Sequence, residues 1–138
     1  MAYKVQEGST ESIVVDGVQD KQYSCGVSSP VFSPDSQHVA YWAGGVIGTS
    51  SLVLDGIEGN FYTYIYMPPV FSPDSKTVVY SAQENGKEHL IINGEESKPY
   101  DHILGGLDGS TMVFDSPNRL HYLAESGNCI YLVEQVVK

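Results

Sequence analysis

Basic residues are scarce in this sequence of 138 residues. Lysine and arginine together number 7 against 17 aspartates and glutamates, which gives a formal net charge of −10. Binding to a nucleic-acid backbone requires clustered Lys and Arg side chains, so this balance argues against a nucleic-acid partner. It also argues against binding to an anionic membrane surface. No apolar run reaches the length of a membrane-spanning helix.

Cysteines are also few, because only Cys25 and Cys129 are present. Two such distant thiols do not form a disulfide framework. We expect both to be free and buried in strands. The segment Met1–Val5 contains no apolar signal region. That favours a cytoplasmic protein, or a periplasmic one if a leader has been removed.

A convincing helical periodicity is missing as well, and the chain contains a repeat instead. Residues 31–41 read Val-Phe-Ser-Pro-Asp-Ser-Gln-His-Val-Ala-Tyr, and residues 70–80 read Val-Phe-Ser-Pro-Asp-Ser-Lys-Thr-Val-Val-Tyr. A third copy, Val-Phe-Asp-Ser-Pro-Asn-Arg-Leu-His-Tyr, occupies residues 113–122. Phe32, Phe71 and Phe114 are therefore 39 and 43 residues apart. A period near 40 residues indicates a repeat architecture.

Tyrosines keep the same period. The first set is spaced by 38, 39 and 42 residues and consists of Tyr3, Tyr41, Tyr80 and Tyr122. Each precedes an apolar segment, and these segments are 12–17, 51–56, 89–94 and 130–135. Seven residues after the Asp or Asn of the first three segments stands a second tyrosine: Tyr23, Tyr62 or Tyr100. We predict that the first set occupies equivalent places in successive units.

Each unit reads as four short strands that are rich in β-branched and aromatic residues. The units are 1–29, 30–68, 69–110 and 111–138; the first lacks its first strand and the last lacks its fourth, which leaves fourteen expected strands. Four-stranded units that repeat radially form β-propellers. The predicted fold is therefore all-β, with roughly 3.5 propeller blades of about 40 residues in a single partial domain, 1–138. Phe71→Ala is expected to cost about 3–5 kcal/mol if the ring is fully buried.

The Phe-Ser-Pro-Asp-Ser…Tyr pattern, followed by Val-Asp-Gly or Leu-Asp-Gly, resembles the TolB-type, WD-repeat-like propeller repeat of bacteria. The same style of repeat occurs in the N-terminal propellers of dipeptidyl-peptidase-like proteins. The resemblance implies a β-propeller and leaves the function open. The sequence departs from the usual Ser-Pro-Asp-Gly, because Ser36 and Ser75 stand where glycine is usual.

No residue pattern indicates catalysis, a cofactor or a metal. Asp35, Asp74 and Asp115 lie in separate units, so we interpret them as turn formers and not as calcium ligands. The segment 43–48, Ala-Gly-Gly-Val-Ile-Gly, precedes a strand and not the helix that a dinucleotide loop requires. The histidines show no metal-ligand spacing; they are His38, His89, His102 and His121. Asp101 and His102 are adjacent in a strand and point to opposite faces, which excludes a catalytic triad.

The variable loops at one end of the units are the expected binding face for a protein, peptide or glycan. Its candidate residues are Trp42, Gly45, Ile47, Tyr66, Met67, Leu107 and Asp108. Trp42 has two interpretations, packing between blades, which we favour, or a stacking surface for a ligand. The alternative function is that of an accessory or remnant propeller domain of a larger, peptidase-like hydrolase.

The last apolar segment has no following strand in its unit, so its edge should aggregate unless something covers it. The candidate assembly residues are Ile130, Tyr131, Leu132, Val133 and Val136. We expect a homodimer that closes a propeller ring of six or eight blades, in preference to an open monomer. The sequence therefore favours a non-catalytic β-propeller module for protein or ligand binding or for self-assembly.

Overall fold

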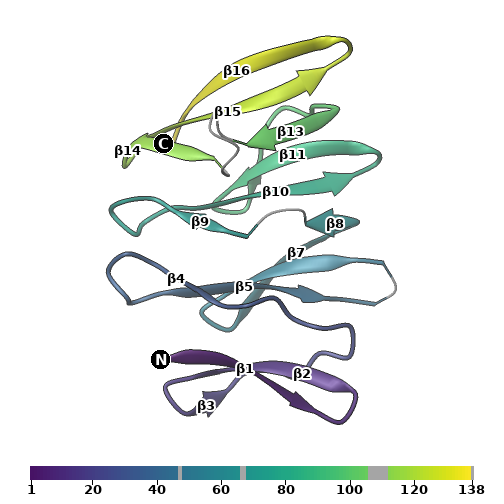
Figure 1. Cartoon of the computed structure of the whole chain (residues 1–138), viewed down its shortest axis with the longest axis vertical. Coiled ribbons are helices and arrows are strands. Elements are labelled where there is room, and N and C mark those ends of the chain that lie inside the picture. Colours follow the sequence, from purple (N-terminus) through teal and green to yellow (C-terminus); the bar gives the residue numbers. More distant parts are fainter. Residues whose placement is uncertain (47, 66–67, 106–111, 138) are drawn as a thin grey trace.

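The backbone forms four antiparallel sheets that follow one another in sequence order (Figure 1). The computed structural model describes residues 1–46, 48–65, 68–105 and 112–137. These residues contain sixteen strands and no helix, so the expected all-β fold is confirmed. The first sheet lies at one end of the long axis of the molecule and the fourth at the other end (Figure 1).

Each sheet is built around a hairpin of two long strands. The first sheet contains β1 (Ala2–Glu7), β2 (Thr10–Val15) and β3 (Val18–Gln19). The second contains β4 (Val31–Phe32), β5 (Val39–Gly44), β6 (Ser50–Leu54) and β7 (Ile57–Tyr62). The third contains β8 (Tyr64–Ile65), β9 (Val70–Phe71), β10 (Val78–Glu84), β11 (Lys87–Ile92) and β12 (Glu95–Glu96). The fourth contains β13 (His102–Gly105), β14 (Val113–Ser116), β15 (Arg119–Ser126) and β16 (Cys129–Val136).

Sixteen strands are present where fourteen were expected, because the first strand of the third and of the fourth sheet is split. β8 and β9 both pair with β10, and β13 and β14 both pair with β15. Pro68 and Pro69 separate β8 from β9, and proline has no N–H with which to continue a ladder. The sheets consequently begin before the expected unit boundaries, since β8 falls within 30–68 and β13 within 69–110.

The repeated tyrosines occupy equivalent places, as predicted. Each lies opposite a β-branched residue of the next strand, and the pairs are Tyr3–Val14, Tyr41–Val53, Tyr80–Ile91 and Tyr122–Val133. The second tyrosine of each of the first three units also occupies an equivalent place. The residue that it faces lies three positions before the partner of the first tyrosine, which is Val14, Val53 or Ile91. Those pairs are Tyr23–Glu11, Tyr62–Ser50 and Tyr100–Glu88.

Three apolar clusters fill the seams between successive sheets. In each cluster a tyrosine packs with an aliphatic residue of the preceding sheet, and these pairs are Ile13 and Tyr41, Leu52 and Tyr80, and Leu90 and Tyr122. The three tyrosines are only 1–2% exposed. Burial of each large apolar side chain stabilises the fold by roughly 1.5–3 kcal/mol, so the seams hold the stack together.

The Ser-Pro-Asp turns are held by their own side chains. Ser33 Oγ donates a hydrogen bond to Asp35 Oδ1 over 2.6 Å, and the N–H of Gln37 donates to the same oxygen over 3.0 Å. Ser72 and Asp74 repeat the first contact at 2.6 Å. These contacts agree with the interpretation of Asp35 and Asp74 as turn formers.

Two sequence-based views of burial need correction. Phe71 lies on a strand of two residues and is only partly buried against its seam, so the condition for the full cost of Phe71→Ala is not met. The prediction of two buried thiols is wrong, because Cys25 and Cys129 are both exposed. Cys25 lies in a turn between sheets, and Cys129 begins β16, which no strand beyond β15 covers in the described residues.

Ser36 and Ser75 stand where the turn requires a left-handed backbone. Their φ angles are +60° and +63°, a region in which glycine is less strained. The two serines differ in their surroundings. Ser75 Oγ accepts a hydrogen bond of 3.0 Å from the N–H of Asp35 across the seam between the second and third sheets. Ser36 is exposed and lies at the same position of the turn in the second sheet.

Replacing each serine by glycine separates the cost of the left-handed backbone from the benefit of the hydrogen bond across the seam. Ser36→Gly is expected to raise the free energy of unfolding by about 0.5–1 kcal/mol, because it relieves the backbone and removes no bond across a seam. Ser75→Gly gives the same relief but removes a bond worth about 1 kcal/mol, so its net effect should be lower by that amount. Denaturant titration of both variants measures the difference. Equal gains would contradict a role for Ser75 in the seam.

Candidate functional site

Polar side chains close the seam between the first and second sheets. Glu58 Oε1 accepts a hydrogen bond of 2.9 Å from the hydroxyl of Tyr23 and one of 2.7 Å from Lys21 Nζ. In the opposite direction, the hydroxyl of Tyr41 donates to Asp20 Oδ2 over 3.0 Å. Each sheet thus supplies a tyrosine donor and a carboxylate acceptor to the other.

The same contacts shift the pKa values of these groups. The hydrogen bond from Lys21, followed by that from Tyr23, holds the pKa of Glu58 below its ordinary value. Burial, followed by the contact with Glu58, raises the pKa of Tyr23. Burial and then Asp20 raise the pKa of Tyr41 in the same way. The carboxylate of Glu58 is therefore ionised at neutral pH, and the hydroxyls of Tyr23 and Tyr41 are hydrogen-bond donors.

The other two seams each contain a pair of tyrosines, and in the seam between the second and third sheets burial and, less strongly, Glu96 raise the pKa of Tyr62. Tyr62 and Tyr80 meet edge to face with ring centroids 6.3 Å apart, and Tyr100 and Tyr122 do so at 6.2 Å. The hydroxyls of Tyr62 and Tyr122 are buried. Glu96 lies beside the first hydroxyl, and Tyr100 and Ser97 lie beside the second.

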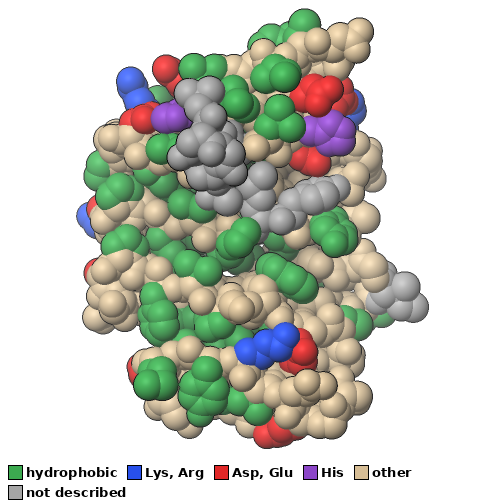
Figure 2. Space-filling model, in the orientation of Figure 1, with side chains coloured by type: hydrophobic (Ala, Val, Ile, Leu, Met, Phe, Trp, Pro, Cys, Tyr) green, Lys and Arg blue, Asp and Glu red, His purple; other side chains and the backbone are tan. Residues whose placement is uncertain are grey.

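The two end sheets expose the residue types that the seams bury. On the first sheet Tyr3 is 48% exposed, whereas its equivalents in the other sheets are 1–2% exposed. On the fourth sheet Leu132 is 55% exposed, whereas the equivalent Leu90 is fully buried. In the face shown in Figure 2, apolar side chains reach the surface over both end sheets. We name these surfaces the first-sheet flank, which also contains Met1, and the fourth-sheet flank, which also contains Ile130.

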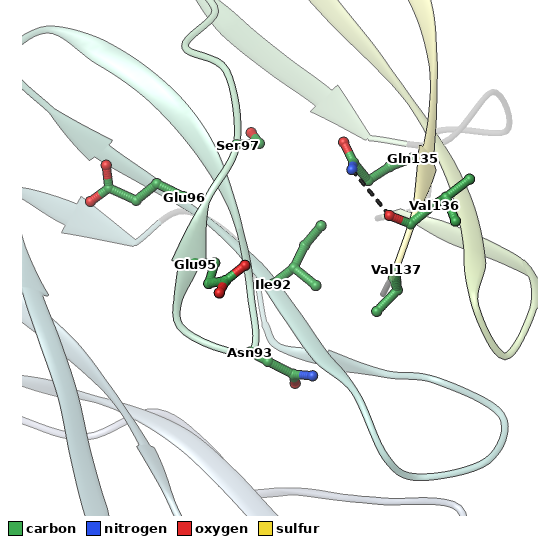
Figure 3. Close-up of a pocket in the computed structure, with 8 residues that line it drawn as sticks. All are labelled: Ile92, Asn93, Glu95, Glu96, Ser97, Gln135, Val136 and Val137. Carbon is green, nitrogen blue, oxygen red and sulfur yellow. Dashed lines mark hydrogen bonds between the residues drawn. The ribbon is translucent and has the colours of Figure 1, made fainter.

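The expected assembly residues all lie on β16, the last strand of the fourth sheet. Four are exposed, namely Ile130 at 65%, Tyr131 at 49%, Leu132 at 55% and Val136 at 52%. Val133 is instead partly buried and packs into the seam with the third sheet. Along the edge of β16 runs a groove of about 350 Å³ between residues 135–137 and residues 92–97 (Figure 3).

The structure describes two of the seven residues expected at the binding face. Trp42 is partly buried and packs into the seam between the second and third sheets. Gly45 lines a depression of about 640 Å³ together with Tyr23, Cys25 and Phe61. A side chain at Gly45 would collide with the Phe61 ring, since a Cβ there would lie 2.6 Å from Cε1. Ile47, Tyr66, Met67, Leu107 and Asp108 lie outside the described residues.

Titratable side chains elsewhere brace the ends of strands. His38 Nδ1 lies 2.7 Å from Asp55 Oδ2, and His121 Nδ1 lies 2.8 Å from Asp115 Oδ2. Asp101 contacts Lys87 and accepts a hydrogen bond of 2.7 Å from the N–H of Gly127. Over the described part of the chain, no three His, Cys, Asp or Glu side chains form a metal-ligand group. Nor does any helix there have the length and apolarity to cross a membrane.

Sequence reasoning did not single out Lys21 or Glu58, although one signal was present. Lys21 precedes Tyr23 by two residues, and the same spacing recurs in Lys98 and Tyr100. Neighbouring strands from different sheets bring Glu58 to this pair, and no periodic pattern reports that contact.

The depressed pKa of Glu58 predicts a pH dependence. Its contribution to stability is present above its ordinary pKa of 4.5 and is lost as the pH falls below that value. At pH 7, Glu58→Gln is expected to lower the free energy of unfolding by about 1 kcal/mol, and the difference from the wild type should shrink progressively as the pH falls below 4.5. Denaturant titration across this range measures it. A difference that is independent of pH would contradict the role of the carboxylate.

No family model matches the chain, and no curated protein matches it. Among solved structures the chain is similar to the crystal structure of TolB from Acinetobacter baumannii, with 14% sequence identity and a TM-score of 0.46. The superposition covers 99% of this chain and 50% of that chain, so this chain spans half the length of that protein.

Proposed function

We propose that the chain is a non-catalytic β-propeller module whose function is protein binding, and that its first partner is a second copy of itself. The supporting observation is the matched exposure of Tyr3 and Leu132 on opposite end sheets. In all three internal seams, the residues at these two positions belong to one apolar cluster. A fourth-sheet flank placed on the first-sheet flank of another copy repeats that packing.

Such a contact joins two different surfaces and is therefore heterologous, so it closes into a ring only if the rotation between chains permits it. Four sheets in each of two chains supply eight blades, within the usual range of about 4 to 8. Closure removes both apolar flanks from water, which is the driving force for the association.

The non-catalytic part of the proposal has support from one fragment of the chain. Asp101 and His102 are the only adjacent pair that suggested a triad. The carboxylate of Asp101 is engaged by Lys87 and Gly127, and His102 Nδ1 lies 3.3 Å from Glu88. Both side chains thus make local structural contacts. No observation favours the alternative of a hydrolase remnant.

Charge placed on either flank should prevent association. The wild-type chain is expected to sediment as a dimer at micromolar concentration, whereas Tyr3→Glu and Leu132→Glu should each raise the dissociation constant at least about tenfold, because an unpaired carboxylate is costly to bury. Ile57→Glu is the matched control, because Ile57 is 73% exposed and lies on the second sheet.

Mixing the two flank variants tests the geometry. A heterologous contact pairs the intact fourth-sheet flank of Tyr3→Glu with the intact first-sheet flank of Leu132→Glu, so the mixture should recover part of the dimer. A monomeric wild type, or a dimer that only Leu132→Glu disrupts, would contradict the proposal.

A further inference from the structure

The edge of β16 presents the backbone groups that bind a further strand in other sheets. The N–H of Tyr23 donates to Glu11 O over 2.7 Å, and the N–H of Glu11 donates to Tyr23 O over 2.8 Å. Tyr100 and Glu88 repeat this pair at 2.9 and 2.8 Å. Ile130 is the equivalent of Glu11 and Glu88, and within the described residues β16 pairs only with β15. The N–H and C=O of Ile130 therefore face an open edge.

A pair of side-chain donors beside this edge has no carboxylate acceptor among the described residues. In the first seam Lys21 and Tyr23 converge on the carboxylate of Glu58, the second residue of the outer strand β7. Lys98 and Tyr100 stand at the same places on the third sheet, since Tyr23 and Tyr100 occupy the same ladder position. The described residues contain no strand beyond β16 that could carry the matching acceptor.

Lys98 has no acceptor in the described part of the chain, since it is exposed and its Nζ makes no hydrogen bond or ion pair there. Tyr100 is half-buried, meets Tyr122 edge to face and interacts with the Tyr122 hydroxyl. Lys98 and Tyr100 thus repeat the positions of Lys21 and Tyr23 without the carboxylate of the first seam.

A groove lies open beside the C-terminal end of β16. The groove of about 350 Å³ lies between the edge of β16 and the outer strand of the third sheet. Figure 3 shows Gln135, Val136 and Val137 on one wall and Ile92 and Ser97 on the other. Glu95 and Glu96 also line it, so additional acidic residues in an occupant are disfavoured.

We propose that the edge of β16 binds an extended peptide segment that adds to the fourth sheet as an outer strand. Its backbone pairs with Ile130, one residue places a carboxylate on Lys98 and Tyr100 at the position that Glu58 holds on β7, and its other residues are uncharged. Backbone pairing supplies affinity, and the single carboxylate supplies register and specificity, as in other cases of strand addition. This goes beyond self-association, which uses the sheet flanks and not this edge.

The chain itself supplies the probe. A fluorescent peptide with the sequence of residues 56–62, Gly-Ile-Glu-Gly-Asn-Phe-Tyr, with blocked ends, carries its carboxylate at the required position. Anisotropy should show saturable binding to the wild-type chain. The peptide with Gln in place of Glu should bind about tenfold more weakly, because a charge-assisted pair is lost.

Protein variants locate the contact. Lys98→Gln should weaken binding of the Glu peptide about tenfold and leave the Gln peptide unchanged, which is the signature of a direct pair in a double-mutant cycle. Lys76→Gln removes the same charge from an exposed turn position of the third sheet and should have no effect. Any of three results would overturn the proposal. The first is that the losses of binding free energy from Lys98→Gln and from Glu→Gln in the peptide prove additive, and the second is that Lys98→Gln and Lys76→Gln have equal effects. The third is no binding at about 1 mM peptide.

Two further measurements separate this proposal from self-association. Tyr3→Glu, which should be monomeric, should bind the peptide as the wild type does. If the chain proves monomeric and still binds the Glu peptide through Lys98, only the dimer proposal fails. If the peptide dissociates a wild-type dimer, a second copy occupies the edge, and the present proposal is overturned.

Discussion

The stack depends on the contact between a tyrosine of one sheet and an aliphatic side chain of the sheet before it. Tyr41, Tyr80 and Tyr122 are almost fully buried in this contact, and each belongs to a different apolar cluster. A single sheet of three to five short strands cannot bury its own faces, so its stability comes from its neighbours. The same dependence explains why Tyr3 and Leu132, at the same positions on the two end sheets, are exposed apolar side chains.

Polar groups add specificity to these apolar seams. The carboxylate of Glu58 collects the donors Lys21 and Tyr23, and the hydroxyl of Ser75 accepts the N–H of Asp35. Each bond contributes about 1 kcal/mol, less than the apolar burial beside it, but each requires one register between the sheets. A seam that lacks this carboxylate keeps its packing, as at Tyr100 and Tyr122, and leaves Lys98 without a carboxylate partner in the described residues.

The sequence predicted the structural features that repeat with a period near 40 residues. The spacing of the tyrosines predicted their common register, and the Ser-Pro-Asp turns predicted the role of Asp35 and Asp74. It did not predict the split strands, because β8 and β9 are each two residues long and carry no alternation of their own. It also missed the exposure of the two thiols and the Lys21–Glu58 pair, which depend on which sheet covers which. Such contacts follow from the three-dimensional arrangement and not from residue types along one strand.

The equivalence of the open flanks to an internal seam is the central claim, and a thiol cross-link tests it most directly. Tyr3→Cys and Leu132→Cys are introduced together into a chain in which Cys25 and Cys129 are serine. Stacked sheets lie about 10 Å apart, which is too far for a disulfide, so a short bis-maleimide is the cross-linker. It should yield covalent dimers, because the two new thiols lie across one contact, as Tyr122 and Leu90 share one apolar cluster inside the stack. Mapping of the cross-link by mass spectrometry should join position 3 of one chain to position 132 of the other. A chain that yields no covalent dimer, or one that links position 132 to position 132, would contradict the account.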